Sequence, residues 1–463
     1  MVPHHATSLL AAADPITVNA GDTAWILASS ALVLLMTPGL AFFYGGLTRA
    51  KSTLNMMMMS FVTITIISVL WAVFGFKMAF GSSTTSGWIG DFSFSGLADA
   101  SLTNVEFFGK GDGIPVIVFA AFQLMFAIIT PALISGAIAD RTKFLSWSIF
   151  VTIWAILVYF PVAHWIFDFG VLNSNGTKGW LAAAGVEDFA GGTAVHINAG
   201  AAGLALCIVL GKRVGFKKNP MRPHNVTLVL LGSGLLWFGW FGFNAGSALA
   251  ANGLAGLAFM NTQVATAAAL GGWLLVERFR DGHATSVGAA SGAVAGLVAI
   301  TPACAFITPV ASVILGLIAG AVCAFAVGLK YKLGYDDSLD VVGVHLVGGI
   351  IGCLYIGFMG SSKANSLGLD GLFYGGGATL LGKQALGAFS VLAYSFIVTF
   401  VIGFVINKTI GFRVSADVEV EGIDINEHAE SAYEFDTQSS SGNIPSGHLV
   451  GATSSTNQTE VHA

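Results

Sequence analysis

Long apolar runs alternate with short polar segments along almost the whole chain. Each run has about 18 to 25 residues, and a helix of that length crosses roughly 30 Å of hydrocarbon. Eleven runs are found, at residues 24–44, 53–75, 114–137, 144–166, 190–210, 226–248, 257–276, 285–303, 308–328, 340–359 and 386–407. The pattern predicts an all-α polytopic membrane protein with eleven transmembrane helices, whose two chain ends lie on opposite sides of the bilayer.

The basic residues predict how this bundle is oriented. Cytoplasmic loops of membrane proteins carry the excess of lysine and arginine. If the N-terminus lies outside, fifteen of the 20 lysines and arginines fall on the inner side. We therefore expect an extracellular segment at 1–23, a membrane domain at 24–412 and a cytoplasmic C-terminus, in a multi-pass protein of the cell (plasma) membrane.

Composition agrees with a lipid environment. Apolar residues make up 55% of the chain and charged residues 10%, against the roughly 25% charge of soluble domains. The net charge of −5 lacks the basic excess that nucleic-acid binding needs, so a nucleic-acid partner is not expected. The four cysteines lie in apolar stretches without a C-x-x-C pair, which predicts neither a disulfide framework nor a thiolate metal site.

The chain after the last apolar run is acidic. Residues 414–463 contain nine aspartates and glutamates and no lysine or arginine. The part at 413–436 is predicted to be a cytoplasmic regulatory region, and within it residues 423–435 have spaced apolar side chains and are candidates for docking on the inner loops. The part at 437–463 is rich in serine, threonine, asparagine and glycine, and we expect it to be disordered.

Two of the predicted spans carry the same polar signature. Asp188 precedes His196 by eight residues, and Asp337 precedes His345 by eight. Small residues follow both histidines, as in tightly packed membrane helices. Because the copies lie in the fifth and tenth spans, the second enters the membrane from the other side. This predicts an inverted repeat of spans 1–5 and 6–10, with a pathway at the repeat interface.

The matched histidines are candidates for lining this pathway. Each of His196 and His345 lies roughly 12 Å into the bilayer, and titratable groups at that depth usually face a cavity. A histidine that merely bonds a carbonyl of a neighbouring helix is the alternative. Two neutral imidazoles offer donors and acceptors to a small molecule such as ammonia, water or a short amide. No third ligand stands at metal spacing, so neither a metal nor another cofactor is expected.

Five segments resemble the ammonium transporter family (Amt/Mep/Rh). They are DFAGGTAVHINAG at 188–200, PGLAFFYGG at 38–46, GWFGFNAGS at 239–247, TPAC at 301–304 and DVVGVH at 340–345. The resemblance covers residues 24–435, almost the whole chain. It implies a transporter or channel for ammonium, with methylammonium as an analogue, and not an enzyme. It also implies a homotrimer of eleven-helix subunits with one pore through each subunit.

The resemblance also assigns pore residues by their position in the motifs. His196 and His345 would be the twin histidines of the pore. Ser247 would recruit ammonium outside, and Phe126 and Phe243 would form a phenylalanine gate below it.

Two further features of the family pattern need interpretation in this chain. The family usually has a tryptophan where this chain has Phe167, so either Phe167 or the nearby Trp165 would complete the recruitment site with Phe126. Asp188 and Asp337 correspond to structural carboxylates, and at helix N-termini they would act as caps, with direct binding of the substrate as the alternative.

The chemistry of ammonium agrees with these roles. Ammonium and potassium are cations of similar size, so selection requires a site that bonds N–H groups and a passage that admits only the neutral amine. Aromatic faces hold a cation at about 0.5 to 2 kcal/mol apiece. Carrying the intact ion through an apolar pore would cost far more, which favours deprotonation at the gate.

Other functions fit parts of the same pattern. An ammonium sensor that signals through the cytoplasmic tail with little flux is one alternative. An intramembrane hydrolase that uses the histidines would need an activated nucleophile, metal or carboxylate beside them, and none is visible. The family resemblance implies a PII-type signalling protein as a partner of the tail, and a solvated acidic tail without a partner is the alternative.

Overall fold

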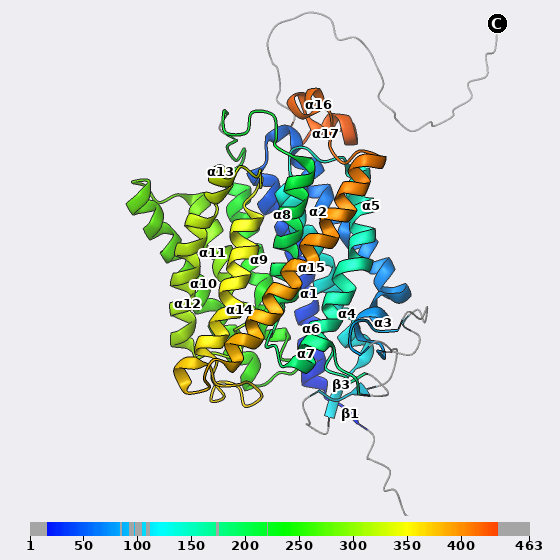
Figure 1. The fold of residues 1–463 in the computed structure, drawn as a ribbon, viewed down its shortest axis with the longest axis vertical. Helices are drawn as coiled ribbons and strands as arrows, with labels where there is room; N and C mark the ends of the chain where they lie inside the picture. Colours follow the sequence, from blue (N-terminus) through cyan, green and yellow to red (C-terminus); the bar gives the residue numbers. More distant parts are fainter. Residues whose placement is uncertain are drawn as a thin grey trace, which may run out of the picture. The chain divides into compact units, whose positions relative to one another are not determined.

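The computed structural model describes residues 16–83, 86–91, 97, 104–107, 112–172, 176–219 and 221–433. Within the compact unit that ends at Ala432, long helices lie side by side as a bundle (Figure 1). The longer α-helices are α1 (Ala20–Leu47), α2 (Thr53–Leu70), α4 (Val116–Ser135), α5 (Phe144–Trp154), α8 (Asn198–Leu210), α9 (Val226–Gly246), α10 (Gly253–Arg280), α11 (Ser286–Ile300), α12 (Pro309–Ala326), α14 (Val347–Met359) and α15 (Thr379–Thr409).

Shorter helical pieces extend or connect these helices. The short α-helices are α3 (Phe76–Phe80), α6 (Phe160–Phe167), α7 (Trp180–Ala184), α13 (Leu329–Leu333), α16 (Ala416–Glu421) and α17 (Ile423–His428). The π-helical segments are η2 (Trp71–Gly75), η5 (Ala155–Tyr159), η6 (Gly192–Ile197) and η7 (Val342–Leu346), and the 3₁₀ segments are η1 (Ala50–Ser52), η4 (Gly136–Ile138) and η8 (Leu372–Tyr374).

Ten helical segments of the described chain are long and apolar enough to cross a membrane. They overlap ten of the eleven runs that the sequence predicts as spans. The eleventh run, at 285–303, contains α11, whose 15 residues reach only about 22 Å. This helix ends at Ile300: Thr301 still has helical backbone angles, but the next residue, Pro302, has no backbone N–H to donate to the preceding turn. The count of eleven spans therefore stays a prediction.

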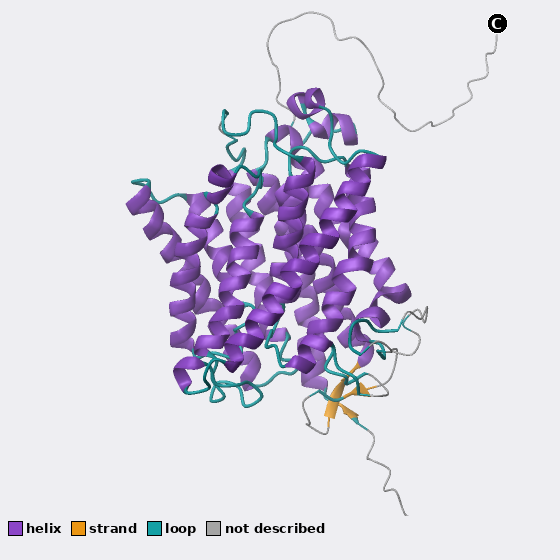
Figure 2. Cartoon of the chain, viewed as in Figure 1, coloured by secondary structure: helices purple, strands orange, loops and turns teal. Residues whose placement is uncertain are grey.

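A small β-sheet departs from the all-helical prediction. β1 (Thr17–Val18) pairs in parallel with β3 (Asp112–Pro115), and β3 pairs in antiparallel fashion with β2 (Asn104–Val105). Figure 2 shows these strands at the end of the bundle opposite α16 and α17. Strands of two to four residues are too short to leave a readable alternation of polar and apolar positions, so the sequence did not predict them.

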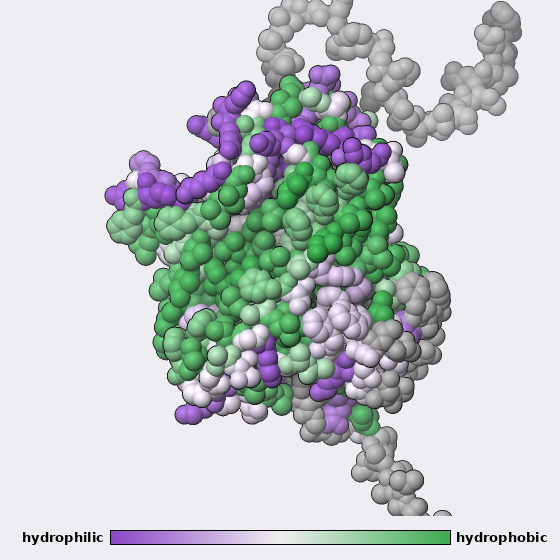
Figure 3. All heavy atoms as spheres, viewed as in Figure 1, coloured by the Kyte–Doolittle hydropathy of each residue, from purple (hydrophilic) through white to green (hydrophobic). Residues whose placement is uncertain are grey.

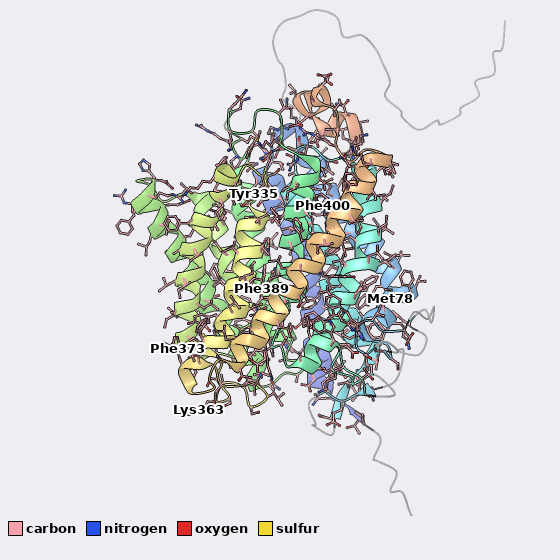
Figure 4. The ribbon with its side chains drawn as sticks, in the orientation of Figure 1. Met78, Tyr335, Lys363, Phe373, Phe389 and Phe400 are labelled. Carbon is pink, nitrogen blue, oxygen red and sulfur yellow. The ribbon has the colours of Figure 1, made fainter. Side chains whose placement is uncertain are left out.

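The visible surface of the bundle has the polarity expected for a membrane protein. Figure 3 shows a broad hydrophobic belt, with hydrophilic side chains gathered at the end that carries α16 and α17. Phe389 and Phe400, labelled on α15 in Figure 4, are exposed within this belt. Exposed aromatic and aliphatic side chains in such a band are stable when they face lipid.

The helices that carry the two matched histidines are built alike. Each begins with a π-helical segment, η6 or η7, and continues as a 13-residue α-helix, α8 or α14. The two helices approach very closely, since a Cβ atom added to Gly200 would lie 2.5 Å from the backbone nitrogen of Leu346. Only glycine permits this contact, which brings both π-helical segments together in the middle of the molecule.

The first part of the acidic C-terminal region docks on the bundle. The carboxylate of Asp424 accepts hydrogen bonds from the amides of Leu54 (3.0 Å) and Asn55 (2.8 Å) in the first turn of α2. Glu427 accepts one from the amide of Phe144 at the start of α5 (2.8 Å). Carboxylates stabilise helix N-termini because they satisfy free N–H groups and oppose the helix dipole.

The chain ends test the predicted boundaries only in part. α1 begins at Ala20, four residues before the predicted start, because Asn19 caps it by accepting a hydrogen bond from the amide of Asp22 (2.9 Å). The predictions for residues 1–15 and for the disordered tail at 437–463 lie outside the described residues.

Candidate functional site: a buried histidine pair between two cavities

His196 and His345 face one another in the core. Their Nδ1 atoms are 3.3 Å apart, and the ring centroids are separated by 5.4 Å with an interplanar angle of 22°. Both side chains are almost fully buried. A hydrogen bond between two Nδ1 atoms uses one proton, so in a neutral pair one ring is protonated on Nδ1 and the other on Nε2. Such a pair offers one N–H donor and one bare nitrogen to a third molecule.

Aromatic rings surround the first histidine. The indole of Trp240 lies 5.3 Å from the His196 ring, and the ring of Phe243 lies 6.0 Å from it, both in stacked geometry. Trp240 is itself held by a hydrogen bond from Nε1 to the Thr301 hydroxyl (2.8 Å). Nε2 of His196 has no hydrogen-bond partner among the described residues. This atom is therefore available to a small guest molecule.

Phe126 and Phe243 meet beside the histidine pair, where Phe243 stacks on His196. Phe126 projects from α4 and Phe243 from α9, and their ring centroids are 4.2 Å apart. Both rings are fully buried, and Phe122 packs against Phe126 at 4.9 Å. The two rings form an apolar barrier next to His196, as their predicted role as a gate requires.

A cavity of about 480 Å³ lies on the other side of this barrier. Its lining includes Phe126, Phe167 and Ser247, three of the residues predicted for ammonium recruitment. The Ser247 hydroxyl donates its proton to the carbonyl oxygen of Phe243 (2.8 Å). Because that proton is used, the Ser247 oxygen can act only as an acceptor toward a molecule in the cavity.

Trp165 does not line this cavity. Its Nε1 donates to the carbonyl oxygen of Trp88 (2.7 Å), and its ring packs against Trp180 and Tyr394. Of the two aromatic candidates, only Phe167 therefore faces the cavity. Positions 165 and 167 point about 200° apart around a helix, so they cannot both face one cavity.

Two further cavities lie on the His345 side of the histidine pair, away from Phe126 and Phe243. A small one of about 30 Å³ is lined by His345 and Tyr44 among others. A larger one of about 570 Å³ carries the basic side chains Arg213, Lys217 and Lys218. Four residues line both cavities, which makes the two neighbours: Leu47, Val287, Leu339 and Asp340. The histidine pair thus lies between the 480 Å³ cavity and the 570 Å³ cavity, which we call the outer and the inner cavity after the orientation predicted from the sequence.

Asp188 fixes the start of the first histidine segment. Its carboxylate accepts four backbone N–H groups, those of Gly191 (2.8 Å), Gly192 (2.7 Å), Thr193 (2.8 Å) and Ala194 (3.2 Å). With both oxygens used in this way, the side chain caps η6, and the π-helical turn that carries His196 is held in place.

Asp337 has the corresponding position before the second histidine. It accepts hydrogen bonds from the amides of Val341 (3.1 Å) and Val342 (2.7 Å) at the start of η7. Burial raises its pKa, and the ammonium group of Lys330 partly opposes that effect. Both carboxylates thus have the geometry of helix caps, which was their predicted role.

Some lining residues were not predicted from the sequence. Trp240 lies inside the segment GWFGFNAGS, three residues before Phe243, and this helical spacing could have placed it on the same face. Phe306 and Leu369 reach the outer cavity from loops far along the chain, and no local pattern indicates that. Among the described residues, no group of three histidine, cysteine, aspartate or glutamate side chains could hold a metal ion.

Comparison with known proteins assigns the chain to a family. Residues 24–433 match the model of the Ammonium Transporter Family. An ammonium transporter of Mycobacterium tuberculosis is 54% identical over 444 residues, covering 91% of this chain and 92% of the relative, and one of Bacillus subtilis is 45% identical, covering 89% and 98%. The crystal structure of Saccharomyces cerevisiae Mep2 superposes with a TM-score of 0.80 at 33% identity, covering 91% and 93%.

These matches agree with the geometry. The match to the family model, the two relatives and the Mep2 structure each span about nine-tenths of this chain, and together with the ten apolar helices they describe a multi-pass membrane protein. The predicted resemblance is confirmed: this chain belongs to the ammonium transporter family.

Proposed function

We propose that this protein carries ammonium across the cell membrane by binding it outside, removing a proton and conducting ammonia past the two histidines. The observation that carries the proposal is the order of the parts. An outer cavity, the Phe126–Phe243 barrier, the His196–His345 pair and an inner cavity follow one another. The proposal explains why each of these groups has its chemistry.

Recruitment takes place in the outer cavity. The Ser247 oxygen accepts one N–H of the ion, and the faces of Phe126 and Phe167 attract its charge. Each aromatic face contributes about 0.5 to 2 kcal/mol, which gives weak and reversible binding. Potassium gains from the aromatic faces but has no N–H group for the serine.

Proton loss occurs at the barrier, where water on the outer side takes the proton as the neutral amine moves on; the current recorded in the test below shows whether that proton stays outside. The contact of 4.2 Å between the Phe126 and Phe243 rings excludes water in the resting structure. A cation that entered between them would lose its hydration without replacement, which is far more costly than passage of the neutral amine. The rings therefore select ammonia, and potassium cannot follow because it has no proton to lose.

The histidines then guide ammonia onward. One imidazole accepts an N–H of ammonia at its bare nitrogen, and the other donates an N–H to the ammonia lone pair. The free Nε2 of His196 is the first such position after the barrier. These bonds replace part of the hydration that ammonia loses. Because both imidazoles are neutral, neither ring gives ammonia a proton that would trap it as ammonium.

The proposal includes the predicted architecture. Eleven spans with the N-terminus outside would make α11 a short, buried span, and an inverted repeat would relate η6–α8 to η7–α14. We also propose that the protein forms a homotrimer with one pore per subunit, as the family resemblance implies, and that a PII-type regulator binds its cytoplasmic tail. Light scattering of the detergent-solubilised protein tests the trimer.

The test uses purified protein in liposomes. An ammonium or methylammonium jump should produce uptake, while internal pH and current are recorded, and a potassium jump of equal size should not. Binding without flux would contradict transport and favour the sensor. A current that accompanies uptake indicates net charge movement, and its absence indicates electroneutral passage of ammonia.

A further inference from the structure

Glu187 lines the outer cavity and has no part in the steps above. It lies in the loop between α7 and η6 and is only 9% exposed. Its Oε1 atom accepts a hydrogen bond from the amide of Leu369 (2.7 Å). Its Oε2 atom is buried and has no hydrogen-bond partner among the described residues. A buried carboxylate oxygen without a partner is costly unless a cation or a donor joins it.

The backbone around this side chain is held firmly. The amide of Glu187 donates to Oε1 of Gln384 (2.7 Å), and Nε2 of Gln384 donates to the carbonyl oxygen of Glu187 (2.7 Å). These two hydrogen bonds to α15 hold the backbone of Glu187, and the bond from Leu369 holds its carboxylate in the wall of the cavity. The free oxygen is therefore a preorganised acceptor and not one conformer of a mobile side chain.

None of the charged side chains near Glu187 occupies its free oxygen, Oε2. Asp188, the next residue, uses both carboxylate oxygens in capping η6. Lys383 on α15 is near enough to lower the pKa of Glu187, but it is not a hydrogen-bond partner of either carboxylate oxygen. Lys178 lines the same cavity and is exposed. Burial dominates, and it raises the pKa of Glu187 to about 7.

We propose that Glu187 is a second cation-binding group of the outer cavity, whose ionised Oε2 accepts an N–H of ammonium or a small alkylammonium ion before the ion reaches Ser247. This inference rests on the proposed transport function. Serine and phenylalanine hold a cation only weakly, whereas a buried carboxylate attracts charge over several ångströms and forms the stronger, charge-assisted kind of hydrogen bond. The cavity would then discriminate ammonium from neutral solutes.

The inference gives a direction for the pH dependence. A carboxylate is negatively charged above its pKa, so Glu187 recruits cations well above pH 7 and loses this ability as the pH falls. Methylammonium remains a cation throughout this range, because a primary amine such as lysine titrates at about pH 10.4. A change in apparent affinity near pH 7 therefore reports on the protein and not on the substrate.

A purely structural role is the competing explanation, and one substitution separates the two. In Glu187→Gln the amide oxygen can still accept from Leu369, so the loop contact is kept, but the negative charge is lost. Asp370→Asn is the matched control. It removes one acidic charge from the nearby loop at 361–371, where Asp370 binds Ser362 and does not line the cavity.

The experiment measures KM for methylammonium uptake into proteoliposomes at about pH 6 and about pH 8. We expect the KM of the unmodified protein to fall about tenfold between these values, as titration near pH 7 requires. Glu187→Gln should have a high KM that does not change with pH, and Asp370→Asn should behave as the unmodified protein. A Glu187→Gln protein with unchanged KM and unchanged pH profile overturns the inference.

The experiment distinguishes a failure of the proposed transport function from a failure of the role of Glu187. If the unmodified protein transports no methylammonium at either pH, the proposed transport function fails and not only the role of Glu187. If Glu187→Gln is not recovered as folded protein, the unmodified protein decides: a pH-independent KM overturns the inference, and a tenfold fall supports it.

Discussion

His196 and His345 share a 3.3 Å contact between their Nδ1 atoms, although 149 residues separate them in the chain. Each ring is presented by a π-helical turn that an aspartate caps, Asp188 for the first and Asp337 for the second. π-Helical turns widen the helix locally and are frequent at functional sites. The contact therefore depends on backbone geometry at two helix starts, and substitutions there and at the rings should have different effects.

Replacing the histidines should impair transport and leave the fold intact. In His345→Ala, or with both histidines replaced, ammonia loses hydrogen-bond partners beyond the barrier, and each lost bond is worth about 1 kcal/mol. We expect ammonium flux or selectivity over potassium to fall by about thirtyfold in the double variant, where two such bonds are lost, measured in proteoliposomes. His283→Ala, at an exposed position, is the control. Unchanged rate and selectivity in the double variant would contradict the pore role.

The phenylalanine barrier predicts a change in selectivity. Phe243→Ala should remove the ring that separates the outer cavity from His196, so that water and ions reach the histidines. We expect a potassium or proton leak in addition to ammonium uptake, together with a loss of about 3 to 5 kcal/mol of stability from the cavity. Phe389→Ala, on the exposed face of α15, should change neither. A Phe243→Ala protein that leaks neither potassium nor protons would contradict the role of this ring as a gate.

Much of the helical core could be read from the sequence because hydrocarbon thickness fixes the length of an apolar run. The ends of the helices could not, since polar caps such as Asn19 and Asn252 extend α1 and α10 beyond the apolar residues. α11 was predicted with the others, and Pro302 shortens it below the usual spanning length.

The site was predictable where a motif carried it. The histidines, Ser247 and Phe243 lie in recognisable segments, and in the structure each contacts the next: His345 contacts His196, His196 stacks on Phe243, and Ser247 bonds the Phe243 carbonyl. The choice between Trp165 and Phe167 depends on the rotation of α6, which neighbouring rings decide and no local pattern encodes. No sequence pattern marks Glu187, because its carboxylate is held through Oε1 by the amide of Leu369, more than 180 positions away, and only Oε2 stays free.

Phe167 offers a test of the recruitment site. Tryptophan is the strongest aromatic partner for a cation, so Phe167→Trp should strengthen binding by about 0.5 kcal/mol, which is roughly a twofold lower KM for methylammonium. Trp165→Phe should instead lower thermal stability, because it loses the bond to the Trp88 carbonyl, and should leave KM unchanged. If the two variants show the reverse pattern, Trp165 and not Phe167 belongs to the site.

Asp188 should matter for stability more than for substrate binding. Asp188→Ala leaves four buried N–H groups without an acceptor, which we expect to cost about 3 kcal/mol and to lower the unfolding temperature in detergent. Asp281→Ala, at an exposed carboxylate, is the control. A stable Asp188→Ala protein with weakened methylammonium binding would mean that the carboxylate acts on the substrate.

The docked C-terminal segment predicts a change in protease sensitivity. Asp424→Asn removes the charge that caps α2, which is worth about 1 kcal/mol at a helix N-terminus, so α16 and α17 should detach more often. A glutamate-specific protease reports this detachment, because the chain beyond Arg413 has no lysine or arginine for trypsin. Asp417→Asn, at an exposed residue of α16, should not accelerate cleavage. Deleting the residues after Phe435 should leave ammonium uptake intact, since the docking contacts lie before that point. Equal cleavage rates in Asp424→Asn and Asp417→Asn would show that the cap does not hold the segment.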